Sequence, residues 1–485
     1  MWSHQSYYPG TQPDLDIVRL APGDGCLSLE WRCYRPGLAN MQVRLYALTG
    51  GSSFLLGMLL RRRYRSVPTL AARAGFRCTL VASAASGGVQ TQFDGLTNGT
   101  LYAVQLCADG VSSRIRLAVP CDVPGAVVNY IHPFDPAYGF SGRFTCSPSL
   151  LRLADGSLLA SHDVYARAGG QNLTKIFRSR DGGASWQYVT DIFPCFWGKL
   201  FAKGNTLYLL GTKTEYGALL LGTSTDGGES WSDPVTLHKG GSRAKGGPHR
   251  APMQLTEQDG RIWTALEHGS WQRGGHATGV VSAPLDADWS RAESWTVSGF
   301  LPYDKSWSGT VRGGRPSLLE GNVLPTPSGG LVNLLRYETK LATPNYGKAI
   351  YLNIDTTHPE KAPTFGSAID FEGNLSKFSV LYDAKSAAYY ALANRVTKGQ
   401  PLKQRSVLSL CVSRDLHHWQ TAADLLDARS LSAEKVAFQY PDFLIADDDL
   451  LVFSRTAWDH ADNFHNANFV TFHRVAAFRG CRAKA

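Results

Sequence analysis

The stretch EGNVLPTPSGGLVNLLR, residues 320–336, decides the fold. Its apolar residues flank a Thr-Pro-Ser-Gly-Gly turn, a pattern typical of two strands joined in a hairpin with one apolar face. The hairpin itself does not require Glu320 at one end or Arg336 at the other. Such charged side chains are costly to bury unless they are paired or used, so they either face solvent or belong to a site.

The same unit of apolar strand, polar turn and apolar strand occurs five more times. The copies are SLLRLADGSLLASHD (149–163), KLFAKGNTLYLLGT (199–212), APMQLTEQDGRIWTALE (251–267), KFSVLYDAKSAAYYALAN (377–394) and YPDFLIADDDLLVFSR (440–455). Repeats spaced by roughly 50 to 70 residues are typical of four-stranded blades around a central channel. The sequence therefore predicts an all-β fold, with a six-bladed β-propeller over residues 126–485 preceded by a small β-sandwich.

Residues 1–125 alternate apolar and polar side chains, as half-exposed antiparallel strands do. An apolar Trp31 is followed by LTNGTLYAV (96–104), and this pattern resembles fibronectin type III domains. The resemblance implies a corner hydrogen bond by Tyr102. The proline-containing stretch 120–133 indicates a linker.

Composition narrows the choice of partners. The net charge of +9 over 485 residues suits either acidic partners or a solvated surface, and the second interpretation is favoured, so no nucleic-acid partner is expected.

No apolar run is long enough to span a membrane. Nine scattered cysteines without a C-x-x-C pair indicate free thiols. With no signal sequence in evidence we expect a cytoplasmic protein, or a secreted one if a signal was trimmed; the oligomeric state stays open.

Two octapeptides carry the most specific local pattern, SRDGGASW (179–186) and STDGGESW (224–231), and SRDLHHW (413–419) is a degenerate third copy. Asp followed by Gly-Gly favours a tight turn whose amides bond the Asp and Ser side chains while the Trp packs beneath. These turns are structural. They resemble the Asp-boxes of the sialidase superfamily, and the resemblance covers residues from about 130 to 480.

The resemblance implies a set of site residues. In that family a Glu precedes the second Arg of a substrate-binding triad by about fifteen residues, and Glu320 and Arg336 match this spacing. Arg405 matches the third Arg and Tyr440 the nucleophile of the last blade. Arginines clamp a carboxylate in bidentate fashion, and sialidases use a Tyr nucleophile, for which Glu320 is the base. The alternatives are ordinary packing for Tyr440 and structural ion pairs for the charged residues.

The chain also departs from the family pattern. The first blade carries TCSP (145–148) where the first Arg is expected, and the following loop, 166–174, contains no Asp for the acid/base. Arg250 occupies the equivalent place on the third blade and is a candidate for the missing guanidinium. His162 and Asp163 are the nearest acid/base candidates, and a structural role for this pair is the alternative.

The end of the chain is rich in groups that hydrogen-bond sugars. They either form a polar rim to the channel, with His465 or His473 as another acid/base, or they satisfy one another where the last strands close the propeller. From this part of the chain, Gln439, Asp442, Arg455 and His465 are further substrate-binding candidates. Asn322, in the hairpin 320–336, is another.

These patterns predict a glycoside hydrolase that cleaves a terminal acidic sugar, sialic acid or a related one, from a glycan with retention. A polysaccharide lyase using His162 or His465 as base, a neutral-sugar glycosidase and a non-catalytic glycan-binding propeller are the alternatives, since a fold does not fix a function. No cofactor is expected, and no ligand set for a metal recurs in the sequence.

Overall fold

The structure is a computed structural model, and it describes residues 2, 13–61, 66–85, 88–311, 315–340, 346–373, 376–397 and 404–481. Nearly all regular structure in these residues is antiparallel sheet. The all-β fold class predicted from the sequence is confirmed.

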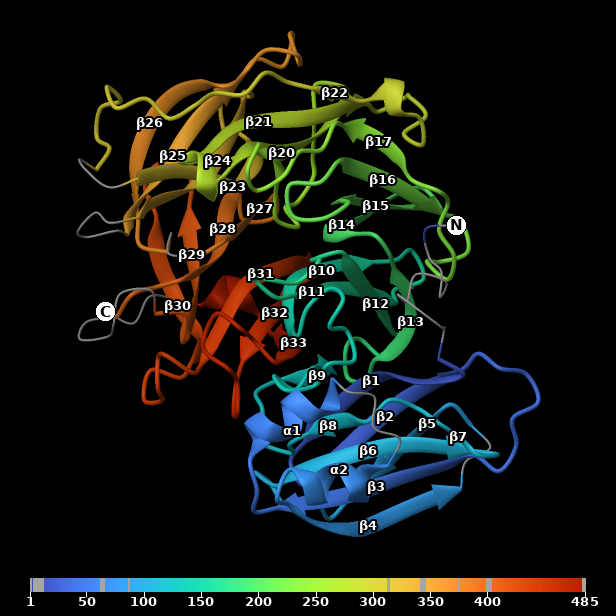
Figure 1. The fold of residues 1–485 in the computed structure, drawn as a ribbon. Coiled ribbons are helices and arrows are strands. Elements are labelled where there is room, and N and C mark those ends of the chain that lie inside the picture. The colour runs from blue at the N-terminus through green and yellow to red at the C-terminus, as the bar shows by residue number, and fades with distance from the viewer. Residues whose placement is uncertain are drawn as a thin grey trace.

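The larger part of the chain is a β-propeller with six sheets ranged around a common centre (Figure 1). The first three blades are β10–β13 (Phe144–Arg152, Leu158–Tyr165, Leu173–Ser179, Gln187–Ile192), β14–β17 (Phe196–Lys203, Thr206–Thr212, Leu219–Ser224, Val235–His238) and β18–β22 (Gly247–His249, Thr256–Gln258, Arg261–Ser270, Gly275–Pro284, Thr296–Val297). The next two are β23–β26 (Arg315–Pro325, Leu331–Lys340, Gly347–Ile354, Thr364–Phe371) and β27–β30 (Ser379–Asp383, Ala388–Asn394, Val407–Ser413, Gln420–Asp427). Each of the six predicted hairpins is an antiparallel strand pair.

The sixth blade closes the ring with strands from both ends of the propeller. It contains β31 (Ala437–Ala446), β32 (Asp449–Ala457) and β33 (Phe469–Val475), and β33 pairs with β9 (Ala126–Tyr130). The sequence-based assignment of residues 120–133 to a linker is therefore wrong for residues 126–130. Val128 is fully buried there, so a short apolar run flanked by prolines forms an outer strand instead of a connection.

The first part of the chain folds into two sheets that face each other. One contains β1 (Leu15–Gly23), β2 (Cys26–Cys33) and β5 (Gln90–Phe93); the other contains β3 (Gln42–Thr49), β4 (Arg77–Ala85), β6 (Leu101–Ala108), β7 (Val111–Ser112) and β8 (Arg116–Ala118). Trp31 and Tyr102 belong to the core between them. The N–H of Thr97 donates to the Tyr102 hydroxyl at 3.0 Å, which confirms the predicted corner hydrogen bond.

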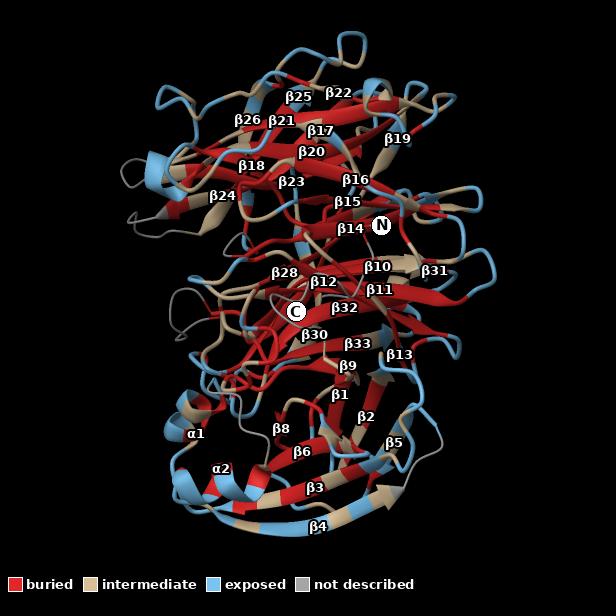
Figure 2. Cartoon of the chain, turned by 45° about the vertical axis from the view of Figure 1, so that its right-hand side comes forward, coloured by how far each residue is buried: buried red, intermediate tan, exposed pale blue. Residues whose placement is uncertain are grey.

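Two short helices, α1 (Ser53–Leu60) and α2 (Val67–Arg73), lie between β3 and β4 and were not predicted from the sequence. The side chain of Ser52 accepts the N–H of Leu55 and caps α1. Leu56 and Leu60 then pack onto the outer face of the five-stranded sheet. Figure 2 shows these helices and β4 as exposed on their outer sides, in contrast to the buried strands of the blades. Short 3-10 helices span Trp271–Arg273, Ala292–Ser294 and Phe478–Gly480.

The three predicted Asp-box turns share one set of hydrogen bonds. In the first, Ser179 Oγ donates to Asp181, the N–H of Gly183 donates to Ser179 Oγ, and Trp186 Nε1 donates to Gly183 O at 3.1 Å. The second repeats these bonds. The third does so with Leu416 at φ +66°, where the others have glycine. The turns lie between the two outer strands of their blades, which supports a structural role.

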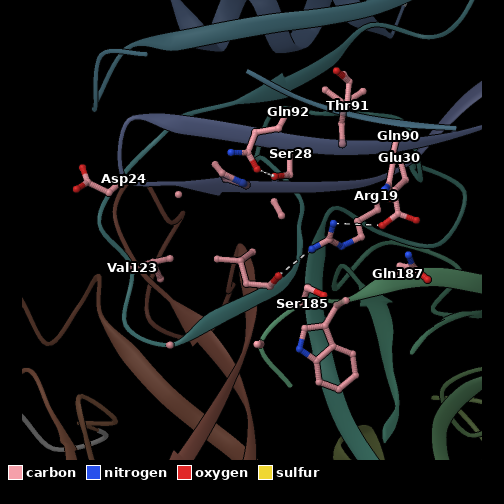
Figure 3. A pocket seen from close by; sticks show the side chains of 18 of the residues that line it. Arg19, Asp24, Ser28, Glu30, Gln90, Thr91, Gln92, Val123, Ser185 and Gln187 are labelled. Atoms are coloured by element: carbon pink, nitrogen blue, oxygen red, sulfur yellow. Dashed lines mark hydrogen bonds and ion pairs between the residues drawn. The ribbon is translucent and has the colours of Figure 1, made fainter. Parts of the chain in front are cut away.

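The sandwich docks on the first blade through a buried ion pair. Arg19 Nη1 lies 3.2 Å from Glu30, and Arg19 Nε donates to the carbonyl of Val128 in β9. Glu30 also accepts the N–H of Tyr188 in β13 at 2.9 Å. A polar cavity of about 640 Å³ lies beside this contact, between β2, β5 and the first Asp-box turn (Figure 3). One ion pair thus joins two strands of the sandwich to both the first and the last blade.

Candidate active site

Four inner strands carry a β-bulge at the same point of their blades. The bulged residue has a positive φ and is Ser147 in β10, Trp197 in β14, Glu320 in β23 and Tyr440 in β31, with φ values of +51°, +55°, +54° and +53°. Non-glycine residues rarely adopt this conformation, and bulges of this kind re-aim side chains next to functional sites. Two of the residues that the sequence singled out, Glu320 and Tyr440, therefore occupy equivalent strained positions.

Glu320, Arg336 and Tyr440 meet in one cluster. Arg336 Nη1 donates to Glu320 Oε2 at 2.9 Å and to the Tyr440 hydroxyl at 3.3 Å. The Tyr440 hydroxyl in turn donates a hydrogen bond to Glu320. Arg336 Nη2 donates to Glu338 at 2.6 Å. The phenol and the carboxylate are thus within direct hydrogen-bonding reach, as a nucleophile and its base require.

Two more guanidinium groups face the Tyr440 ring. The Cζ atoms of Arg405 and Arg455 lie 5.7 Å and 5.3 Å from its centroid. Arg405 is 6% exposed and Arg455 3% exposed, whereas Tyr440 is half-buried. The structure therefore brings together five sequence-predicted residues, Glu320, Arg336, Arg405, Tyr440 and Arg455, and Arg455 supplies the third guanidinium.

The charges of this cluster set its protonation state. Burial would raise the pKa of Glu320, but the charge and hydrogen bond of Arg336 outweigh it and hold that pKa below its ordinary value of 4.5. Burial, together with the negative charge of Glu320, raises the pKa of Tyr440 above 10. At neutral pH the carboxylate is ionised and the phenol keeps its proton, so Glu320 can accept the proton that Tyr440 must lose.

Gln439 and the loop after β32 hold two of the arginines in place. Gln439 is fully buried; its Oε1 accepts from Arg405 Nη1, and its Nε2 donates to the carbonyl of Phe464. Arg455 Nη2 donates to the carbonyl of His465. Burial and the charges of Arg455 and Arg405 hold the pKa of His465 well below 6.5. These contacts explain why polar side chains are so frequent at the end of the chain. Gln439 positions Arg405. His473 lies apart, bonded to Thr471 in β33.

Arg250, the sequence-based candidate for a third guanidinium, is bonded elsewhere. Its Nη1 donates to the carbonyl of Leu210 at 3.2 Å and its Nε to that of Ala251 at 3.3 Å. Burial lowers its pKa to about 10, and Glu267 is the first of the charges that oppose this. Arg455, and not Arg250, is the third guanidinium beside Tyr440.

His162 and Asp163 do not face the cluster. His162 is fully buried, with Nε2 2.9 Å from Asn129 Nδ2 and its ring stacked on Phe177. Asp163 accepts Thr174 Oγ1 at 2.5 Å and the N–H of Trp197 at 2.6 Å. Burial raises the pKa of Asp163 to about 7, but its oxygens are occupied in supporting the bulges. We therefore assign both residues to the structure of the blades and not to proton transfer.

Asn322 and Asp442 stand two residues after the bulges and bond to other blades. Asn322 Oδ1 accepts the N–H of Val380, and its Nδ2 donates to the carbonyls of Leu334 and Phe378. Asp442 pairs with Lys199 at 2.6 Å and accepts the N–H of Leu150 at 2.7 Å. Their polar atoms are satisfied inside the protein, so blade-to-blade contact replaces the sugar-binding role that the sequence suggested for them.

Several residues near the cluster escaped the sequence analysis. Glu338 follows Arg336 by two positions on β24 and so shares its face of the strand, a signal that was available. Trp197 lies at the bulge equivalent to Glu320, which only the strand register reveals. His249 pairs with Glu267 across β18 and β20 at 3.4 Å, and its charge contributes to lowering the pKa of Glu320.

The described residues contain no group of three or more His, Cys, Asp or Glu side chains arranged to hold a metal ion. All nine cysteines are free thiols. Within the same described ranges, no helix has the length and apolar character needed to cross a membrane.

The blades and Asp-box turns define a six-bladed propeller of the sialidase-like class. The sequence model for the BNR repeat-like domain matches residues 201–452, more than half of the chain, so the protein belongs to that family. No curated protein sequence matches the chain.

Three solved structures are similar to this chain at low sequence identity. A Hadza microbial sialidase superposes with a TM-score of 0.50 and 13% identity, over 96% of this chain and 94% of its own. The Penicillium chrysogenum alpha-L-arabinanase gives a TM-score of 0.48 and 14% identity, over 75% and 100%. The alpha-L-arabinofuranosidase of Fusarium graminearum gives 0.47 and 15%, over 72% and 98%. The first of these likenesses supports the propeller fold and leaves the substrate open.

Proposed function

We propose that this protein is a glycoside hydrolase that removes a terminal acidic sugar from a glycan with retention of configuration. The observation that carries the proposal is the placement of the Tyr440 hydroxyl. It is bonded to both Glu320 and Arg336, and its ring lies beneath Arg405 and Arg455. The fold is shared with a sialidase and with arabinan-degrading enzymes, so the proposal rests on the site and not on the fold.

The charge balance of the cluster favours an anionic substrate. Three guanidinium groups face the carboxylates of Glu320 and Glu338, both of which bond to Arg336. Arg405 and Arg455 donate to uncharged oxygens, the amide of Gln439 and the carbonyl of His465. The guanidinium groups of Arg405 and Arg455 thus lie in a largely buried site beside Tyr440, and a substrate carboxylate would complement their charge.

The chemistry proceeds through the phenol. Tyr440 Oη attacks the anomeric carbon while its proton passes to Glu320, and the bond to the leaving oxygen breaks as that oxygen takes up a proton. Water then attacks the anomeric carbon, gives up one proton and releases the sugar, and Tyr440 recovers its proton from Glu320. A nucleophile that is neutral before attack avoids repulsion by an anionic sugar, and the arginines stabilise the phenolate character that develops on Oη.

The test is hydrolysis of a matched panel of nitrophenyl glycosides of sialic acid, glucuronic acid, glucose and arabinofuranose. We expect kcat/KM for one acidic sugar to exceed that for every neutral sugar by about a hundredfold or more, the equivalent of about 3 kcal/mol from a buried charge pair. The methyl ester of the preferred sugar is the matched control, and it should lose most of this advantage. Preference for a neutral sugar would contradict the acidic-sugar assignment.

A polysaccharide lyase is the second candidate. It is favoured by His465, whose depressed pKa keeps the imidazole unprotonated, and so able to accept a proton, beside Arg455. Such an enzyme would remove the proton next to the carboxylate of a uronic acid and release an unsaturated product that absorbs in the ultraviolet. Appearance of that absorbance on polyuronides, with no hydrolysis of the glycoside panel, would favour the lyase.

The pH profile should show an acid limb set by Glu320. This carboxylate must be ionised to accept the Tyr440 proton, and Arg336 holds its pKa below 4.5. We therefore expect kcat/KM to stay level as the pH falls to about 4.5 and to drop only below it. Intrinsic fluorescence recorded at each pH separates this drop from unfolding. An acid limb centred above pH 5 in folded protein would rule out Glu320 as the base.

A further inference from the structure

The third blade contributes a His–Glu pair next to the proposed catalytic pair. His249 ends β18 and stands opposite Glu267 in β20, with 3.4 Å between His249 Nδ1 and Glu267 Oε2. The other oxygen of Glu267 accepts the N–H of Gly321 at 3.2 Å. Glu267 is 1% exposed. One buried carboxylate therefore orients the imidazole and also fixes the bulge that carries Glu320.

Neighbouring rings define the orientation of His249. Trp197 and His276 lie 4.5 Å and 4.3 Å from it between ring centroids. Because Nδ1 faces Glu267, Nε2 points to the opposite side of the ring. Among the described residues Nε2 of His249 has no hydrogen-bond partner. His249 also lies close enough to Glu320 to contribute to lowering the pKa of that carboxylate. The imidazole thus presents one nitrogen that is free to exchange a proton at the edge of the proposed site.

The proposed reaction needs a group of this kind. Glu320 and Tyr440 exchange a proton with each other, but neither can protonate the leaving oxygen. His162 and Asp163 are occupied inside the first blade. A carboxylate that holds one nitrogen of an imidazole while the other handles the substrate proton is a recurrent arrangement for general acid/base catalysis.

We propose that His249, oriented by Glu267, is the general acid/base of this site; the proposal rests on the proposed glycosidase function. In the first step Tyr440 Oη bonds to the anomeric carbon, Glu320 takes the phenol proton, and the His249 Nε2 proton passes to the leaving oxygen as its bond to the sugar breaks. In the second step water attacks the anomeric carbon and gives a proton to Nε2, and Tyr440 leaves and regains its proton from Glu320. Both groups return to their starting states.

The test compares two glycosides of the preferred acidic sugar, one with a dinitrophenyl and one with a methyl leaving group. The dinitrophenolate leaves without protonation, whereas the methyl glycoside requires it. We expect His249→Gln to lower kcat/KM for the methyl glycoside by about a hundredfold or more, in the range of general acid catalysis, and for the dinitrophenyl glycoside by less than about tenfold. Azide should speed turnover of the dinitrophenyl glycoside by the variant and give a glycosyl azide.

Two further variants make the test decisive. Glu267→Gln keeps the imidazole and should show the same dependence on the leaving group to a smaller degree, so it carries the test if His249→Gln does not fold. His268→Gln is the matched control: this neighbouring histidine contacts His238 and Phe300 and should leave both rates unchanged.

The outcomes separate this proposal from the proposed function. An equal loss on both glycosides in folded His249→Gln, without rescue by azide, would overturn the role of His249 while leaving the glycosidase intact. A wild-type protein that hydrolyses neither glycoside, or a Tyr440→Phe variant as active as wild type, would overturn the proposed function and this proposal with it.

Discussion

Replacing Tyr440 with phenylalanine should lower kcat/KM for the preferred acidic glycoside by about a thousandfold or more. The change deletes the one atom that is proposed to bond to the sugar and leaves Glu320 without a proton to accept. The ring keeps its contacts with Arg405 and Arg455, so packing is preserved. The measurement is steady-state hydrolysis, accompanied by a melting temperature that should match that of the wild type.

A matched control and a covalent trap strengthen this test. Tyr382→Phe removes a phenol hydroxyl from an exposed site on the fifth blade, where the ring packs on Tyr389, and should leave the rate unchanged. A fluorinated acidic glycoside with a good leaving group should add the mass of one sugar to the peptide that contains Tyr440. Label on a different residue, or activity of the Phe variant above about a tenth of wild type, would exclude the phenol as nucleophile.

Much of the fold could be predicted from the sequence because its signals are local. Each blade contains a hairpin whose apolar alternation is read without knowing its neighbours, and the Asp-box turns need only a few consecutive residues. Strand β9 could not be predicted in this way. Ala126–Tyr130 acquires its role by pairing with β33, more than 300 residues later, and the flanking prolines imitate a linker. Tertiary pairing overrode the local signal.

The site was predictable where one hairpin carries both ends of an interaction. Glu320 and Arg336 close one hairpin, and the structure pairs them at 2.9 Å. His162 and Asp163 could not be placed in this way, because the β-bulge at Ser147 shifts the register of β10 against β11. A bulge reverses which residues face the channel beyond it, and although Pro148 is compatible with a bulge, the sequence TCSP does not fix which residue bulges.

The pair of His249 and Glu267 could not be predicted from the sequence either, because it too depends on strand register. They stand 18 positions apart on strands that are separated in the chain by β19, and only their register brings the imidazole to the carboxylate. Their relation to Glu320 depends on packing between the third and fourth blades. Sequence patterns of one blade at a time therefore find the elements of this site but not the way in which they combine.

Replacing Arg336 with methionine should destabilise the propeller by about 3 to 5 kcal/mol, the usual cost of leaving a buried charge without its partner. Glu320 and Glu338 both bond to this guanidinium, and the side chains of Glu320 and Arg336 are only 4% and 7% exposed. The measurement is the shift of the melting temperature by calorimetry. Arg291→Met is the matched control, because the Arg291–Glu293 pair is exposed on both sides, and exposed pairs contribute little.

The pH dependence of this loss identifies its cause. Because the folded-state pKa of Glu320 lies below its ordinary value of 4.5, the stabilisation is fully present above pH 4.5 and disappears as the pH falls through the lowered folded-state pKa. The melting temperatures of wild type and Arg336→Met should therefore converge in acid. Adding Glu320→Gln to the variant should recover part of the loss at neutral pH, since it removes one stranded carboxylate. A variant that melts with the wild type at pH 7 would show that the arginine does not hold these carboxylates, and the charge balance proposed for substrate binding would then have to be abandoned.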